Sequence, residues 1–163
     1  PLAMSFCAYP YSDAAFVIEW HVVGMYAPGL VTGRLIRRYG VLSVILAGTA
    51  LVAGCAAVAL NGNTVAHFWA ALVLLGVGWN FMYTGGTTLL TESYEPAEKA
   101  KTQGANDFIV FATMGVSSLA SGALVSTAGW ERMNAAALPV LVVVVAAVAW
   151  LAWLRRGATA PRS

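Results

Sequence analysis

The sequence predicts an all-α, polytopic membrane helix bundle with five full transmembrane helices and the tail of a sixth. Its composition and the spacing of its apolar stretches support this fold class. Apolar residues make up 60% of the 163 residues and charged residues 10%, with a mean hydropathy of +0.74. Soluble domains have roughly 45–50% apolar and about 25% charged residues, so a soluble globule of this composition could not cover itself with polar surface. Disorder, which needs low hydrophobicity and high net charge, is also excluded.

Five stretches are long and apolar enough to cross a bilayer. About 20 mostly apolar residues are needed, because the hydrocarbon core is about 30 Å thick and a helix rises about 1.5 Å per residue. The expected spans, in chain order, are residues 14–35, 41–60, 65–90, 105–128 and 134–154. Residues 1–11 are too short to span and are interpreted as the end of a preceding helix. We therefore expect residues 1–163 to be one transmembrane domain of a longer protein.

Each connection between the spans carries a turn or loop signal. Glycines and three arginines fill residues 33–40, and Asn61-Gly62-Asn63 forms a tight turn after the second span. Residues 91–104 are polar, and Pro96 in this segment suits the first turn of a short surface helix. Residues 129–132 separate the last two spans.

The basic residues predict how the spans are oriented. Lys and Arg near span ends are retained on the cytoplasmic side. Eight of the nine basic residues follow the first, third and fifth spans, whereas Arg132 alone follows the fourth. The tail, residues 155–163, is therefore expected in the cytoplasm. The eight residues are Arg34, Arg37, Arg38, Lys99, Lys101, Arg155, Arg156 and Arg162. The net charge of +2 is too small for a nucleic-acid-binding surface.

Two spans carry a distinctive stripe along one helical face. The polar stripe of the third span should face protein or water, and both cavity lining and hydrogen bonding between helices remain open for it. It consists of Asn80, Tyr83, Thr84 and Thr87, followed by Thr91. The small-residue stripe of the fourth span is expected to allow close helix packing. It consists of Gly115, Ser118, Gly122 and Ser126.

Three ionisable residues lie inside the expected spans, where each needs a partner, a water-filled cavity or an interfacial position. Glu19 and His21 are two positions apart, so their side chains should point to nearly opposite helix faces. Either could couple transport to protons, and the alternative is an interfacial position near the headgroups. Asp107 is expected in the first turn of the fourth span, where the positive end of the helix dipole stabilises a carboxylate.

Residues 28–40, PGLVTGRLIRRYG, resemble a loop signature of the major facilitator superfamily. In that family the pattern is Gly, three residues, an acid, a basic residue, any residue, Gly and two basic residues. Gly33 stands in place of the acid and Ile36 in place of the second glycine. The four positions that match in register are Gly29, Arg34, Arg37 and Arg38.

The resemblance implies that the chain is the C-terminal half of such a transporter, from the end of the seventh helix through the twelfth. It implies that spans 41–60 and 134–154 face lipid and that span 65–90 lines the central cavity. Spans 14–35 and 105–128 would then meet the N-terminal half of the same transporter. Because the signature lacks its acid, we hypothesise that Asp107 supplies a carboxylate to Arg34 for gating.

These features predict secondary active transport of a small molecule by alternating access, coupled to protons or another ion, in a bacterial plasma (inner) membrane. Asn80, Tyr83, Thr84 and Thr87 are the candidate substrate path. No phosphate-binding loop is present, and no cofactor, metal site or nucleic-acid partner is expected. The alternative is a non-transporting membrane scaffold or assembly subunit. An intramembrane enzyme is disfavoured, because Glu19 and His21 alone do not supply a nucleophile with its base.

Overall fold

The computed structural model describes residues 2–158, which are helical apart from their connections and contain no strand. The predicted all-α class is confirmed. The helices are α1 (Leu2–Phe6), α2 (Tyr11–Tyr26), α3 (Gly29–Tyr39), α4 (Val41–Leu60), α5 (Val65–Leu90), the short 3-10 helix η1 (Pro96–Glu98), α6 (Lys99–Ala135) and α7 (Ala137–Ala158).

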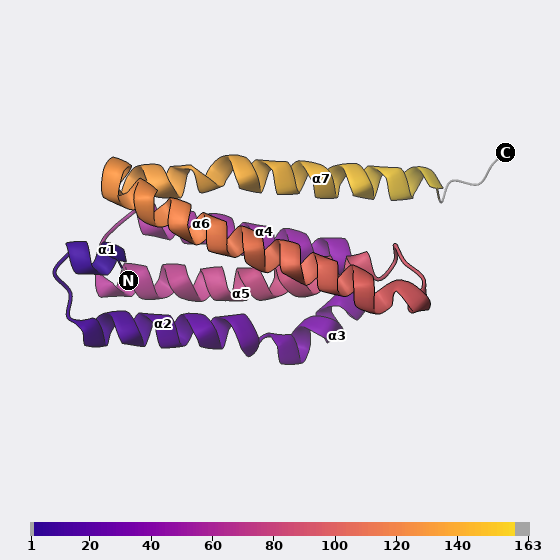
Figure 1. Ribbon diagram of the computed structural model, residues 1–163, viewed down its shortest axis with the longest axis horizontal. Helices are drawn as coiled ribbons and strands as arrows, with labels where there is room; N and C mark the ends of the chain where they lie inside the picture. Colours follow the sequence, from indigo (N-terminus) through magenta and orange to yellow (C-terminus); the bar gives the residue numbers. More distant parts are fainter. Residues whose placement is uncertain (1, 159–163) are drawn as a thin grey trace.

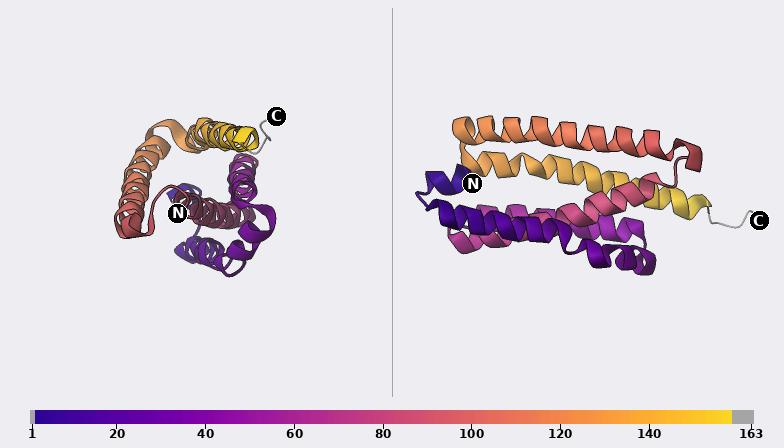
Figure 2. Two further views of the ribbon diagram at one scale, coloured as in Figure 1. Left: turned by 90° about the vertical axis from the view of Figure 1, so that its right-hand side faces the viewer. Right: turned by 60° about the horizontal axis from the view of Figure 1, so that its bottom comes forward.

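The long helices lie side by side as an up-and-down bundle (Figure 1). Viewed along the bundle, α5 occupies the middle, with α2 and α4 against it and with α6 and α7 on the outer side (Figure 2). In the described residues, four helices are long and apolar enough to span a membrane, and α2 with α3 make a fifth span if the bent pair is counted as one. This agrees with the predicted membrane helix bundle.

The first expected span, residues 14–35, coincides with a bent pair of helices in the structure. Helices α2 and α3 meet at Ala27 and Pro28 and are bent by 42°. Proline has no backbone N–H and its ring clashes with the preceding turn, so it kinks a helix. The arginine segment expected as a loop belongs to α3, and the chain turns only at Gly40, whose φ is 85°.

The fourth span also differs in its bounds from the expected residues 105–128. Pro96 opens the single-turn helix η1, as expected, but α6 follows it directly from Lys99. Near its other end, Gly129 has a φ of 85° and a ψ of 170°, which interrupts the helical geometry. Only glycine adopts this conformation without steric cost, so the expected end of the span coincides with a real kink.

Glycines hold the centre of the bundle together. A Cβ placed on Gly76 would lie 2.5 Å from the His21 carbonyl oxygen of α2, and one on Gly48 would lie 2.9 Å from the Gly78 carbonyl oxygen of α5. In contrast, a Cβ on Gly115 or Gly122 would meet nothing within 4 Å among the described residues. Gly115 and Gly122 therefore approach no other helix within the described residues, and the expectation that the stripe allows close helix packing stays a prediction.

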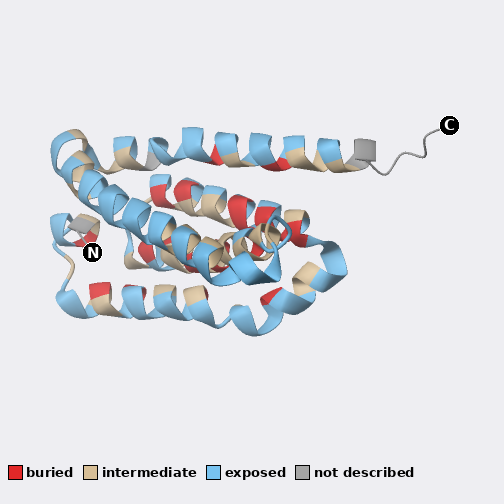
Figure 3. Cartoon of the chain, turned by 45° about the vertical axis from the view of Figure 1, so that its right-hand side comes forward, coloured by how far each residue is buried: buried red, intermediate tan, exposed pale blue. Residues whose placement is uncertain are grey.

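Burial is concentrated on α4 and α5 rather than on α6. One third of the most apolar stretch of α4 is buried, the largest share among the span helices, whereas none of the corresponding stretch of α6 is buried (Figure 3). The expectation that span 41–60 faces lipid therefore needs correction. One face of α4 packs against α5 and α7, and only its opposite face, which includes Leu46, is left for lipid.

The predicted charge asymmetry has a structural counterpart. The end of α3, the start of α6 and the end of α7 lie at the same end of the bundle, and the loop that carries Arg132 lies at the opposite end (Figure 1). Arg155 forms an ion pair with Glu92 at the basic end. Arg162 lies outside the described residues. This clustering matches the expected orientation, and the cytoplasmic side stays a prediction.

The glycine contacts lead to a stability prediction for the full-length protein. We expect Gly76→Val to lower its melting temperature in detergent by several degrees, because the added side chain forces α5 away from α2. Gly86→Val on the same helix is the matched control, since a Cβ there meets nothing within 4 Å among the described residues, and should leave the melting temperature unchanged. Equal melting temperatures of the two variants would contradict the assignment of the packing to Gly76.

Candidate functional site

Asn80 is the centre of a buried polar network between α5 and the break of the first span. Its Nδ2 donates to the Met25 carbonyl oxygen at 2.7 Å, and its Oδ1 accepts from the Thr32 hydroxyl at 2.7 Å. Asn80 is 8% exposed and Thr32 is fully buried. Gly29 leaves room for this amide, because a Cβ there would lie 3.4 Å from Nδ2.

This network explains how a broken helix is tolerated inside a membrane. Near a proline break, carbonyl groups at the end of a helix lose their backbone donors, and a neighbouring helix must supply new ones. Asn80 supplies such a donor to Met25. Of the two alternatives left open for the polar stripe, hydrogen bonding between helices therefore holds for Asn80. Each end of its amide thus makes a hydrogen bond inside the chain.

Of the remaining threonines of the predicted path, Thr87 has a local side-chain partner, and Thr84 takes part in hydrogen bonds through its backbone carbonyl. The Thr87 hydroxyl donates to the Tyr83 carbonyl oxygen of its own helix at 2.9 Å, a common arrangement for threonine in membrane helices. The carbonyl oxygen of Thr84 accepts from Thr88 at 2.7 Å. Neither Thr84 nor Thr87 lines the large cavity described next. The structure therefore does not bring the four predicted path residues to one cavity.

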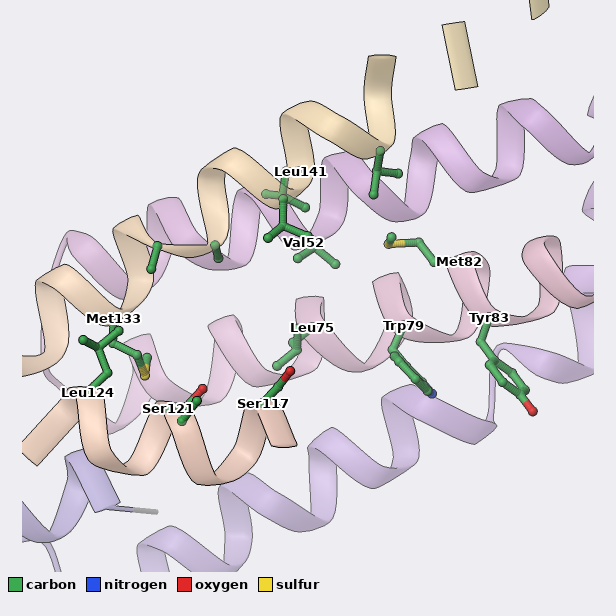
Figure 4. Close-up of a pocket in the computed structure, with 15 residues that line it drawn as sticks. Val52, Leu75, Trp79, Met82, Tyr83, Ser117, Ser121, Leu124, Met133 and Leu141 are labelled. Atoms are coloured by element: carbon green, nitrogen blue, oxygen red, sulfur yellow. The ribbon is translucent and has the colours of Figure 1, made fainter. Parts of the chain in front are cut away.

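A cavity of about 650 Å³ lies between α4, α5, α6 and α7 (Figure 4). Its volume falls in the range of about 300–1,000 Å³ that is typical of small-molecule sites, and its lining is mostly apolar, as in such sites. Of the predicted path residues only Tyr83 lines it. The central part of the lining consists of Leu75, Trp79, Met82, Tyr83, Ser117 and Ser121.

Trp79 and Tyr83 form a stacked aromatic pair on the cavity side of α5. Their ring centroids are 5.5 Å apart and their planes differ by 14°. The Tyr83 hydroxyl donates to Asp107 Oδ1 of α6 at 3.0 Å, which links the two helices beside the cavity. The sequence analysis missed Trp79. A signal was present, because Leu75, Trp79 and Tyr83 are four residues apart and therefore share one helical face.

The two candidate coupling residues lie on α2 in different environments. His21 is half-buried, and its Nδ1 lies 2.8 Å from the Leu72 carbonyl oxygen of α5. Glu19 is exposed. The structure thus ties the imidazole to the neighbouring helix and leaves the carboxylate on the outer surface of the described chain, in keeping with the expectation that they point apart.

The predicted gating pair is not formed in this structure. Asp107 accepts the hydrogen bond from Tyr83, and no ion pair joins it to Arg34 within residues 2–158. Arg34 and Arg37 lie on α3 without a carboxylate partner among the described side chains, and Arg38 lies over the Tyr39 ring, 5.2 Å from its centroid. The polar partner of Asp107 is thus a phenol of the cavity lining.

The comparison with known families decides the classification. The Major Facilitator Superfamily model matches residues 10–163. The chain belongs to the major facilitator superfamily. The resemblance carried by Gly29, Arg34, Arg37 and Arg38 is thereby confirmed at the level of the family, which consists of membrane transporters and points away from an enzyme.

Curated members of the major facilitator superfamily resemble this chain over most of its length. A riboflavin transporter of Brucella anthropi is 43% identical over 144 residues, which cover 88% of this chain and 36% of that protein. An uncharacterized transporter of Bacillus subtilis, YddS, is 32% identical over 88% of this chain and 34% of its own length. The chain thus spans about a third of the length of these relatives. No solved structure matches it.

The Asn80 network leads to a second stability prediction. We expect Asn80→Ala to destabilise the full-length protein by about 1–3 kcal/mol, because the Met25 carbonyl loses its Asn80 donor and the Thr32 hydroxyl keeps only the Pro28 carbonyl as its partner. Thermal unfolding in detergent measures this loss. Asn61→Ala, which removes an amide bonded to the Ala57 carbonyl at an exposed helix end, should have a small effect. Thr32→Val should cost less in the Asn80→Ala background than alone, and additive losses would argue against a shared network.

Proposed function

We propose that this chain is the C-terminal half of a secondary transporter that moves a small molecule across a bacterial plasma membrane by alternating access. In such transporters two helical halves rock around a site near the middle of the bilayer. Membership of the major facilitator superfamily supports this function, and the five apolar spans, counting α2 with α3, supply the required membrane bundle. The basic end of the bundle, which carries Arg34 and Lys99, would face the cytoplasm.

The N-terminal half of the same transporter is the proposed partner of α2 and α6. Helix α6 has no buried residue in its most apolar stretch, and it exposes large apolar side chains such as Phe108, Phe111 and Leu119. Its small-residue stripe, which includes Gly115 and Gly122, meets no described helix. Small residues let membrane helices approach closely, so this stripe suits a helix of the other half.

Riboflavin is the first substrate to test. We choose it because a riboflavin transporter is 43% identical to this chain over 88% of its length. The cavity between α5 and α6 is large enough for a small molecule and includes Trp79 and Tyr83. Coupling to protons is proposed to use Glu19 on α2, which is exposed, with His21 held against α5.

The decisive experiment is uptake of radiolabelled riboflavin by the full-length protein in proteoliposomes. We expect saturable uptake that rises several-fold when an inward-directed proton gradient is imposed. Unlabelled riboflavin should compete with the labelled compound, and empty liposomes are the control. Absence of saturable riboflavin transport, both into and out of the liposomes, would exclude riboflavin as the substrate.

A variant separates coupling from substrate movement. We expect Glu19→Gln to abolish accumulation driven by the proton gradient, because an amide cannot bind and release the proton. Exchange of labelled for unlabelled riboflavin at equal pH should persist, since exchange needs no net proton movement. Glu131→Gln, an exposed carboxylate on α6, is the matched control. Full accumulation by Glu19→Gln would remove Glu19 from the coupling mechanism.

A further inference from the structure

The cavity between α5 and α6 presents three polar groups that have no hydrogen-bond partner among the described residues. They are the indole Nε1–H of Trp79 and the hydroxyls of Ser117 and Ser121. Figure 4 shows the two serines directed from α6 toward α5, with the Trp79 ring on the facing helix. A mostly apolar cavity with a few convergent polar groups is the usual form of a small-molecule site.

The stacked rings give this cavity a preference for flat ligands. Aromatic rings attract one another in offset stacks by about 0.5–1.5 kcal/mol beyond the burial of their area. Trp79 and Tyr83 already lie nearly parallel, with 14° between their planes, so a third flat ring can continue the stack without reorienting them. The serine hydroxyls can then bond polar atoms at the edge of that ring, and the indole N–H, which lies in the plane of its own ring, can donate to a polar substituent that extends beside the stack.

Asp107 fixes the position of the Tyr83 ring. Its Oδ1 accepts the Tyr83 hydroxyl at 3.0 Å, and the neighbouring Asn106 amide lies 3.4 Å from the same oxygen. Phe108, next to Asp107, is exposed and does not contribute to the cavity lining. A hydrogen bond to a carboxylate is stronger than one between neutral groups, so it restricts rotation of the Tyr83 ring.

We propose that Trp79 and Tyr83 form the surface on which a planar heteroaromatic ring of the transported molecule stacks, with Asp107 as the residue that positions Tyr83. This inference rests on the proposed transport function and deepens it, because it assigns the class of substrate and the residues that select it. It also replaces the predicted path of Asn80, Thr84 and Thr87 with the neighbouring face of the same helix.

Equilibrium binding tests the inference separately from transport. The purified full-length protein in nanodiscs is titrated with three probes: riboflavin, lumichrome, which has the ring system without the sugar-alcohol chain, and ribitol, which has the chain without the rings. Binding of the two flavins is followed by quenching of their fluorescence, which stacking on an indole ring produces. Ribitol is tested as a competitor. We expect both flavins to bind and ribitol not to compete.

Substitutions of Trp79 identify the stacking ring. We expect Trp79→Leu to weaken flavin binding about tenfold, which corresponds to about 1.4 kcal/mol, and to lose most of the quenching. Trp79→Phe keeps a flat ring and should bind within about threefold of the wild type. Trp150→Leu is the matched control, because Trp150 is 66% exposed on α7 and lies outside the cavity. In transport assays Trp79→Leu should raise KM with little change in kcat.

The positioning role of Asp107 has its own signature. We expect Asp107→Ala to weaken flavin binding about threefold, whereas Asp107→Asn keeps an acceptor for the Tyr83 hydroxyl and should restore binding. In a Tyr83→Phe background, Asp107→Ala should have no further effect, because the group through which it acts is gone. A loss of binding in Asp107→Asn, or an undiminished effect in the Tyr83→Phe background, would overturn this role.

Two outcomes would overturn the stacking surface itself. One is flavin binding by Trp79→Leu that equals that of Trp150→Leu, and the other is no binding of either flavin by the wild-type protein. Neither outcome removes the transport function, which a non-aromatic substrate could still satisfy. Conversely, if the wild-type protein binds lumichrome through Trp79 but does not transport riboflavin, the stacking surface holds and riboflavin is excluded as the substrate.

Discussion

The structure depends on the close approach of α5 to α2 and α4. Lipid is as apolar as the helices, so the hydrophobic effect gives them no reason to associate, and contact between backbones must do so. Gly76 lies against the backbone of α2, and Gly78 lies against Gly48 of α4. Side chains at these positions would separate the three helices. The glycines thus fix α5 at the centre of the bundle (Figure 2).

Once two faces of α5 are committed to packing, its third face determines what the chain can bind. The face toward α2 and α3 carries Gly76 and Asn80, and the face toward α4 carries Gly78 and Gly85. The face that remains carries Trp79 and Tyr83, and it opens on the cavity because α6 stands away from α5. Because the glycine faces of α5 take up the packing that stabilises the bundle, the face with the aromatic pair stays accessible.

The sequence predicted the fold class and the number of spans, because both follow from the amount and spacing of apolar residues. It did not predict the break at Pro28, since counting apolar residues over a span does not reveal a bend, and the Asn80–Met25 hydrogen bond at the break comes from another helix. The candidate site was predicted only in part. Tyr83 was found through its place in the polar stripe, whereas Trp79 was overlooked because its ring looks like ordinary apolar packing.

A polar residue in a membrane helix can either stabilise the bundle or bind a ligand. Whether its polar atoms already have hydrogen-bond partners within the chain distinguishes the two roles. Asn80 places both ends of its amide on partners inside the chain, so it stabilises the bundle. Trp79 leaves its N–H without a partner in the described residues and lies on a cavity. Adjacent residues point about 100° apart around a helix. Trp79 and Asn80 therefore lie on different faces of α5, one on the cavity and one in the packing between helices. For this reason the pairing of side-chain atoms, which a sequence pattern does not show, is needed to tell the two roles apart.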